Sequence, residues 1–176
     1  MYKKLLHIAI VIIAVISFAW SQFGGHSYTK SQISDVSIDP EAFYTVEHVV
    51  DGDTISVLID KTVIKVRLLG INTPESVDPR KGIECYGPEA SMYLKETLHN
   101  HNVRLEVNPD RELKDKYGRY LLYVYRDDGL FVNKDLIEKG YAHEYTYGKA
   151  YMYQKEFRAA EGTAQSAKLG LWGVCK

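Results

Sequence analysis

The sequence predicts an α+β, mainly β fold: a five-stranded barrel of the OB type with about three helices. Segments with strand and helix patterns follow one another in the order β-β-β-α-β-β-α-α. This order lacks the strand-helix alternation that a doubly wound parallel sheet requires, and the strand count fits an OB barrel. The chain of 176 residues, 45% hydrophobic and 26% charged, suits one globular domain with an additional segment.

Three strands are expected at the start of the domain. They are rich in β-branched residues and occupy Phe43–Val50, Thr54–Ile59 and Thr62–Leu69. Between the first two, Asp51-Gly52 favours a hairpin turn because this pair tolerates positive φ. The turn does not require Asp53, which is either a solvated carboxylate at the start of the second strand or part of a metal site.

The rest of the domain alternates between loops and regular elements. Ile71–Tyr86 contains Pro74 and Pro79 and is expected to be a loop. Gly87-Pro88-Glu89 opens a helix, because Pro and an acidic residue are favoured in the first turn. The remaining predicted elements are two strands and two helices, at Val103–Val107, Tyr120–Tyr125, Val132–Lys139 and Ala150–Leu169.

The first 42 residues are expected to lie outside the domain. Lys3 and Lys4 precede the apolar run Leu5–Trp20, which at about 16 residues is shorter than the roughly 20 that span a bilayer. Residues 1–20 therefore predict a signal peptide, cleaved in a secreted protein; the alternative is an uncleaved anchor facing outside. Residues 21–42 are polar and predict a flexible tether, which leaves residues 43–176 as the folded domain.

The charge balance limits the possible partners. The chain has 22 basic and 23 acidic residues, and without Lys3 and Lys4 the balance is 20 against 23, or −3. A protein that coats nucleic acid non-specifically is usually basic, because phosphate neutralisation drives such binding. Any contact with a polyanion must therefore be local or helped by a cation. No protein partner is implied, and a monomer is the default.

Two cysteines, Cys85 and Cys175, are expected to form a disulfide if the chain is exported. Such a bridge closes a loop of about 90 residues and stabilises by about 4 kcal/mol in the chain-entropy account. Two unpaired thiols are the alternative.

Three clusters carry the reactive side chains. They are Asp53, the segment RLLGINTPE from Arg67 to Glu75, and the segment DKYGR from Asp115 to Arg119. Each has an ordinary interpretation, such as a surface charge or an arginine lying along the barrel wall. A barrel can nevertheless bring the three segments to one rim, where two arginines would meet two carboxylates.

That combination suits phosphodiester cleavage. The reaction needs negative charge on the transferring phosphoryl group to be stabilised and a water to be presented in line with the leaving oxygen. Planar guanidinium groups match phosphate oxygens, and a carboxylate suits the water. Oxygen ligands such as Asp53 suit a hard divalent cation.

The motifs DGDT, RLLGINTPE and DKYGR, in this order and spacing, resemble the staphylococcal nuclease (thermonuclease) family. The resemblance covers about residues 43 to 173 and ends in GLWG. It implies an OB-fold nuclease that depends on Ca²⁺, cleaves DNA and RNA with little sequence preference, and leaves 3′-phosphate ends.

The resemblance also implies roles for single residues. Asp53 would be a calcium ligand, and Thr73 would supply a backbone carbonyl ligand. Glu75 would orient or deprotonate the attacking water, and Arg67 and Arg119 would bind the phosphate. Asn72 stands where the best-known members carry a second aspartate ligand. Its amide still offers an oxygen, so weaker calcium binding is expected.

Four further residues are expected at the substrate. Lys116 and Tyr117 lie within DKYGR and match the wall of the family's nucleotide pocket. Tyr145 and Tyr147 resemble a later tyrosine pair, although their spacing from Gly140 is one residue shorter. Aromatic faces would stack on bases without reading them. The alternative for Tyr145 and Tyr147 is structural packing.

Two other classes of function stay open at this point. A non-catalytic nucleic-acid-binding OB module would explain Asn72 and the charge of −3, but it would leave Arg67, Glu75 and Arg119 without a role. A tethered cell-surface interaction domain would leave all three motifs unexplained.

Overall fold

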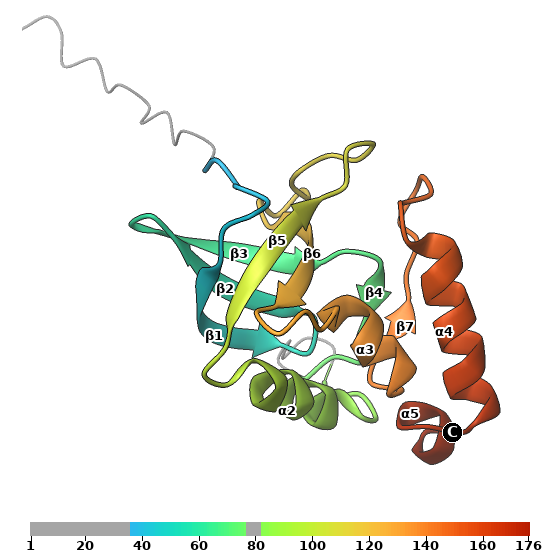
Figure 1. Cartoon of the computed structure of the whole chain (residues 1–176). Helices are drawn as coiled ribbons and strands as arrows, with labels where there is room; N and C mark the ends of the chain where they lie inside the picture. The colour runs from blue at the N-terminus through green and yellow to red at the C-terminus, as the bar shows by residue number, and fades with distance from the viewer. Residues whose placement is uncertain (1–35, 77–81) are drawn as a thin grey trace, which may run out of the picture. The chain divides into compact units, whose positions relative to one another are not determined.

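Five strands close into the barrel that the sequence predicts (Figure 1). The computed structural model describes residues 36–76 and 82–176. Around the barrel the strands are β1 (Tyr44–Asp51), β2 (Thr54–Ile59), β3 (Thr62–Leu68), β6 (Tyr120–Arg126) and β5 (Asn102–Val107). All neighbouring pairs are antiparallel except β3 and β6, whose parallel pairing completes the closure.

Helices cover the barrel at one end and one side (Figure 1). They are α2 (Gly87–Leu98), α3 (Val132–Glu138), α4 (Gln154–Ser166) and the single-turn α5 (Leu171–Val174). Helix α2 packs on β1, and α3 packs on β6 and α4. The predicted helix over 150–169 is therefore too long. The residues just before Gln154 make tertiary contacts instead of helical ones, since Tyr151 is buried and its hydroxyl donates to the Gly70 carbonyl at 3.1 Å.

A small second sheet was not predicted. β4 (Ile71–Asn72) pairs with β7 (His143–Glu144), so Asn72 lies opposite His143. The first residues of the predicted loop Ile71–Tyr86 are thus a strand. Two-residue strands are too short to show an alternating pattern, and only their long-range pairing defines them. Residues 77–81 of that loop lie outside the described residues.

The core fills the barrel with alternating strand side chains. Ile55, Val57 and Ile59 of β2 point inward together with Val66 and Leu68 of β3, as period-2 alternation requires. Each such side chain contributes about 1.5–3 kcal/mol when fully buried. The polar side chain of Asn133 in α3 is also fully buried.

Asn133 joins three parts of the fold. Its amide nitrogen donates to the Leu69 carbonyl at 2.9 Å, and its Oδ1 accepts from the Val124 amide at 2.9 Å. The bend between β3 and β4 is thereby tied to β6 and α3. This bend carries the chain from Arg67 towards Asn72.

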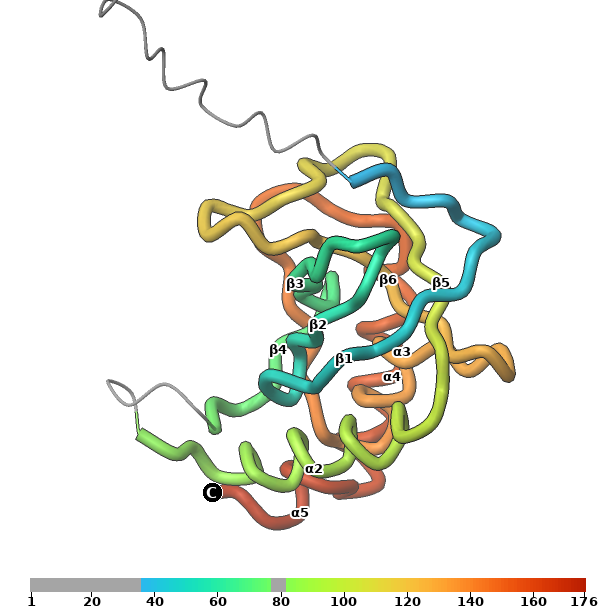
Figure 2. Tube along the Cα trace, turned by 90° about the vertical axis from the view of Figure 1, so that its left-hand side faces the viewer, coloured from blue at the N-terminus to red at the C-terminus, as the bar shows by residue number. Residues whose placement is uncertain are grey.

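Both ends of the domain are held. Near the N-terminus, the Val36 amide donates to the Tyr120 hydroxyl at 3.2 Å. The predicted disulfide is present: Cys85 and Cys175 are bonded, with their Cα atoms 5.9 Å apart, which places the C-terminus beside the segment before α2 (Figure 2). The predicted leader and most of the tether lie outside the described residues. Within the described residues, no helix is long and apolar enough to cross a membrane.

Candidate active site

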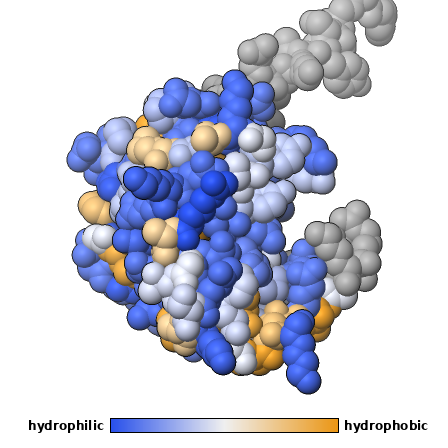
Figure 3. Space-filling model, turned by 90° about the vertical axis from the view of Figure 1, so that its right-hand side faces the viewer, coloured by the Kyte–Doolittle hydropathy of each residue, from blue (hydrophilic) through white to orange (hydrophobic). Residues whose placement is uncertain are grey.

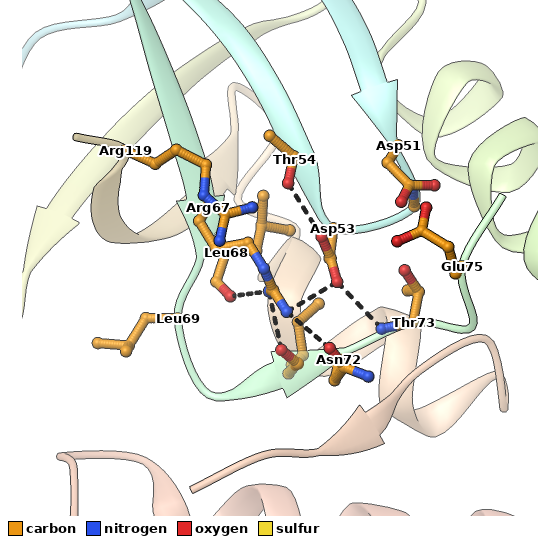
Figure 4. A network of polar contacts seen from close by, with 12 residues as sticks. Asp51, Asp53, Thr54, Arg67, Leu68, Leu69, Asn72, Thr73, Glu75 and Arg119 are labelled. Carbon is orange, nitrogen blue, oxygen red and sulfur yellow. Dashed lines mark hydrogen bonds and ion pairs between the residues drawn. The ribbon is translucent and has the colours of Figure 1, made fainter. Parts of the chain in front are cut away.

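Strand register brings the three reactive clusters to one rim of the barrel. Thr54 pairs with Arg67 across β2 and β3, so Asp53 lies next to this pair. Arg67 also pairs with Leu121 of β6 in the parallel ladder, and Arg119 comes just before β6. Figure 4 shows the side chains of Arg67, Arg119, Asp53 and Glu75 gathered here. The convergence expected from the sequence is therefore observed.

Arg67 is fixed by three hydrogen bonds and one ion pair. Its Nη1 donates to the carbonyls of Leu68 (2.9 Å) and Ile71 (2.8 Å), and its Nη2 donates to Asn72 Oδ1 (3.0 Å) and forms an ion pair with Asp53 Oδ2 (2.8 Å). The side chain is 11% exposed. Burial lowers the pKa of Arg67, and the nearby Asp53 carboxylate opposes that shift. An arginine stays charged under these conditions, so a preoriented cation stands at the rim.

Asp53 and Thr73 form the centre of the predicted metal site. Asp53 Oδ1 accepts from the Thr54 hydroxyl at 3.0 Å, and Oδ2 accepts from the Thr73 amide at 3.1 Å. The hydroxyl Oγ1 of Thr73 is buried and has no hydrogen-bond partner among the described residues. A buried hydroxyl without a partner is costly, so this oxygen is available as a donor or acceptor to a bound group.

A second carboxylate, that of Asp51, lies beside this centre and was missed as a site residue. Its Oδ1 accepts from the Ser76 hydroxyl (2.5 Å) and the Gly52 amide (2.8 Å). Figure 4 shows Asp51 and Glu75 with their carboxylates turned towards each other. Burial raises the pKa of Asp51, and the charges of Asp53 and Glu75 act in the same direction. The spacing Asp51-x-Asp53 was the available signal, but the hairpin interpretation already accounted for Asp51.

The DKYGR segment is a tight turn that aims Arg119. Asp115 Oδ1 accepts from the amides of Tyr117 (2.9 Å) and Arg119 (3.0 Å), and Gly118 has φ of 80°. Asp115 Oδ2 accepts from Arg119 Nε at 2.8 Å. Burial alone would raise the pKa of Asp115, but the hydrogen bonds from Arg119 outweigh it and the pKa is lowered. Figure 4 shows the Arg119 side chain extending towards Arg67.

A cleft of about 680 Å³ begins at this rim. Its walls include seven of the residues predicted from the sequence: Arg67, Asn72, Lys116, Tyr117, Arg119, Tyr145 and Tyr147. Asp53, Thr73 and Glu75 are not among the lining residues, so the carboxylate cluster lies behind Arg67 rather than in the cleft. The predicted site is thus divided into a buried acidic part and an open basic and aromatic part.

Aromatic rings are accessible in the cleft. Tyr117, Tyr147 and Tyr145 are 72%, 71% and 47% exposed, and the Lys116 ammonium lies 5.0 Å from the Tyr117 ring centre. This exposure leaves all three rings available to a ligand.

Arg111 orders the second wall of the cleft and was not predicted. Its Nη1 donates to the Lys149 carbonyl (2.5 Å) and its Nη2 to the Tyr147 carbonyl (2.6 Å). The loop that carries Tyr147 is thereby joined to the loop before Asp115. No local pattern reveals such a contact, because its partners are backbone atoms 36 and 38 residues away.

The donor chemistry fits a hard cation. Within residues 36–76 and 82–176, no three His, Cys, Asp or Glu side chains are arranged to hold a metal ion. Neutral oxygens can complete such a site, and Asn72 Oδ1 is one of them, because it meets the same Arg67 Nη2 as Asp53 Oδ2 does. The buried Thr73 hydroxyl, which has no hydrogen-bond partner among the described residues, is a further oxygen at this place. Oxygen-only sets of this kind suit Ca²⁺.

Comparison with known proteins gives consistent matches. Residues 65–174 match the family model described as "Staphylococcal nuclease homologue". The chain is 37% identical over 172 residues to Thermonuclease of Staphylococcus intermedius, covering 98% of this chain and 99% of that protein. It is 36% identical over 172 residues to Thermonuclease of Staphylococcus hyicus, covering 97% and 98%. Endonuclease YncB of Bacillus subtilis (strain 168) is 35% identical over 152 residues, covering 86% and 68%.

Proposed function

The chain belongs to the staphylococcal nuclease family and is a nuclease, and from this premise we propose that it is a calcium-dependent endonuclease. It hydrolyses phosphodiester bonds of DNA and RNA with little sequence preference and leaves 3′-phosphate ends. The observation that supports this most strongly is the convergence of Arg67 and Arg119 in the wall of a cleft with accessible aromatic rings, with the carboxylates of Asp53 and Glu75 on the other side of Arg67.

The two arginines stabilise the transferring phosphoryl group. Arg67 is held rigidly by its three hydrogen bonds and its ion pair with Asp53, and Arg119 is oriented by Asp115. Preoriented cations act strongly on charge that develops in the transition state, because they need little reorganisation. Arg67 therefore serves as a fixed contact, and Arg119, with a side chain 30% exposed, closes on the phosphate from the cleft side.

The carboxylate of Glu75 acts on the attacking water. The Ser76 amide donates to Glu75 Oε1 at 3.0 Å, which restricts how the carboxylate can turn. Glu75 orients the water or takes its proton while the oxygen attacks phosphorus. The bond between phosphorus and the 5′ oxygen breaks, the 5′ oxygen leaves as an alcohol after taking up a proton, and the phosphate remains on the 3′ oxygen.

Asp53, Asn72 and the Thr73 carbonyl would hold Ca²⁺. When bound there, the ion supplies positive charge that stabilises phosphate oxygens and lowers the pKa of a nearby water. Asn72 contributes an oxygen without a charge, so the site binds calcium more weakly than an all-carboxylate set would. We also propose that the protein is exported, since calcium is plentiful outside cells and residues 1–20 have the pattern of a signal peptide.

The cleft binds single-stranded nucleic acid without reading its sequence. Tyr117, Tyr145 and Tyr147 offer faces for base stacking, and Lys116 lies near the phosphate path. The test is cleavage of end-labelled single-stranded DNA and RNA by the wild type, Arg67→Ala and Arg119→Ala. Arg158→Ala is the matched control, because this arginine is exposed and is not among the cleft residues.

We expect each of the two site variants to lose about 10²- to 10³-fold in cleavage rate, as for removal of one preorganised transition-state contact. The DNA-binding affinity and the fold, followed by circular dichroism, should change little. Products of the wild type should lose their terminal phosphate on phosphatase treatment, as 3′-phosphates do. Rates near wild type in both variants would refute the assignment. Binding without any cleavage would instead support the non-catalytic OB module.

A further inference from the structure

The backbone of Glu75 is held at both of its polar atoms by one residue, Glu84. The Glu75 amide donates to Glu84 Oε2 at 2.8 Å, and the Glu84 amide donates to the Glu75 carbonyl at 2.9 Å. Gly87 lies against the same carbonyl, where a Cβ atom would come within 2.4 Å of it. The position of Glu75 therefore depends on the segment just before α2.

Glu84 is a weak support on its own. It is an exposed residue, so water competes for its carboxylate and for the hydrogen bond that it accepts. A hydrogen bond of this kind contributes only about 0.5–1.5 kcal/mol net. Both hydrogen bonds between Glu75 and Glu84 persist only if the backbone at residue 84 is itself restrained.

The restraint is next to Glu84 in the chain. Cys85 is bonded to Cys175, 90 residues away. Cys175 is anchored in turn, because its amide donates to the Leu171 carbonyl at 2.9 Å and the buried Leu171 donates to the Gly140 carbonyl at 2.9 Å. Figure 2 shows the C-terminus meeting the start of α2.

The bridge is open to reductants. Cys85 is exposed and Cys175 is partly exposed, and the adjacent Ile83 and Val174 are 74% and 67% exposed. The surface seen in Figure 3 is mainly hydrophilic, with apolar residues collected at its lower end. Among the described residues, the bridge and its chain neighbours are therefore exposed or partly exposed rather than buried in the core.

We propose that Glu84 is a positioning residue for Glu75 and that the Cys85–Cys175 disulfide keeps Glu84 in place, so that cleavage by this nuclease is sensitive to reduction. This inference rests on the proposed role of Glu75. A dithiol delivers two electrons and two protons to the two sulfur atoms and becomes a cyclic disulfide itself. The segment around Glu84 is then no longer tied to Cys175, and it no longer fixes the position of Glu75 relative to the attacking water.

The first test compares Glu84→Ala with Glu84→Gln under saturating calcium. Glu84→Ala should lower kcat by about 10- to 100-fold, since a displacement of about 1 Å in a catalytic group has effects of this size. KM for single-stranded DNA should stay within about twofold, because the cleft residues are untouched. Glu84→Gln should recover most of kcat, since its amide oxygen still accepts from the Glu75 amide. Glu96→Ala, an exposed glutamate of α2, is the control.

The second test uses the Cys85→Ser/Cys175→Ser double variant. The kcat of this double variant should fall as much as that of Glu84→Ala. Adding Glu84→Ala to the double variant should lower kcat by much less than the same change does in the wild type, because both changes remove the same support of Glu75. Dithiothreitol should slow the wild type and leave the double variant unchanged. Near-ultraviolet circular dichroism at the assay temperature shows that each variant is folded.

The outcomes separate this inference from the proposed function. If Glu75→Gln keeps the wild-type rate, the catalytic role of Glu75 is wrong and Glu84 has nothing to position. If Glu75→Gln is inactive but Glu84→Ala keeps wild-type kcat, the positioning role is overturned. A loss in Glu84→Ala that Glu84→Gln does not recover, or full additivity with the cysteine changes, also overturns it.

Discussion

At the residue scale, the site depends on one arginine shared between two possible metal ligands. Arg67 Nη2 forms an ion pair with Asp53 Oδ2 and donates a hydrogen bond to Asn72 Oδ1. Asp53 and Asn72 are also two of the residues proposed to bind calcium. A neutral amide at residue 72 therefore weakens the attraction for a cation while it keeps an acceptor for Arg67.

Asn72→Asp should lower the calcium concentration needed for half-maximal cleavage by roughly tenfold, because it adds a charged oxygen ligand. Calcium titration of cleavage and isothermal calorimetry with calcium alone both measure this change. Asn100→Asp, which adds the same charge at an exposed position, should leave the calcium concentration for half-maximal cleavage unchanged. An unchanged requirement in Asn72→Asp would count against residue 72 as a ligand.

The lowered pKa of Asp115 predicts that the stability of the fold depends on pH. The pKa of Asp115 is lowered from the ordinary 3.8 in the folded state, so its carboxylate stabilises the fold above that value and the contribution is lost as pH falls through the folded pKa. Asp115→Asn should therefore destabilise by about 1 kcal/mol, or roughly 3 °C in Tm, at pH 7. The difference from the wild type should shrink below about pH 4.

Thermal unfolding at several pH values checks this prediction. Asp110→Asn, an exposed carboxylate in the same loop, is the control and should follow the wild type at every pH. A gap between Asp115→Asn and the wild type that persists at low pH would assign the effect to something other than ionisation.

At the scale of elements, two loops make the cleft and Arg111 joins them. The DKYGR turn carries Tyr117 and Arg119 on one side, and the segment after β7 carries Tyr145 and Tyr147 on the other. Arg111 bonds the backbone of the second loop through two carbonyls. The width of the cleft thus depends on a bidentate contact that a lysine cannot reproduce.

Arg111→Ala should raise KM for single-stranded DNA by roughly 5- to 20-fold and change kcat by less than about threefold, because it loosens a binding wall and leaves the reacting groups in place. Arg111→Lys should restore little of this, since a single ammonium does not make the planar pair of bonds. Steady-state kinetics measure both values. A fall in kcat with unchanged KM would contradict the assignment.

The sequence predicted what local patterns and linked motifs encode. The barrel, the start of α2 at Gly87, the disulfide and the meeting of Asp53, Arg67 and Arg119 could all be inferred. The β4–β7 sheet and the roles proposed for Arg111 and Glu84 could not, because their partners are backbone atoms of distant or irregular segments. Asp51 was missed for another reason: the turn explained it locally, and only the fold places Ser76 and Glu75 beside it.

At the scale of the whole molecule, charge is local rather than global. The chain carries 22 basic and 23 acidic residues, yet the lining of one cleft has an excess of basic residues: Arg67, Arg111, Lys114, Lys116, Arg119 and Lys149, against Asp110, Glu112 and Asp115. Attraction for nucleic acid should therefore be confined to that cleft, and it should weaken with salt according to the few phosphates that these groups contact.

Lys116→Ala should reduce the slope of log KM against log salt by about 0.7, the value for one phosphate contact on a single strand. The rate at saturating substrate should stay close to that of the wild type. Lys61→Ala, in the turn between β2 and β3, removes the same charge outside the cleft and should leave the slope unchanged. Equal slopes for Lys116→Ala and the wild type would remove Lys116 from the substrate path.

The most direct test of the account is cleavage of single-stranded DNA by the purified protein with calcium and with a chelator, alongside Glu75→Gln. The account predicts cleavage with calcium, none with the chelator, and a loss of about 10²-fold or more in Glu75→Gln while DNA binding persists. Binding without cleavage at any calcium concentration, or full activity in Glu75→Gln, would contradict it.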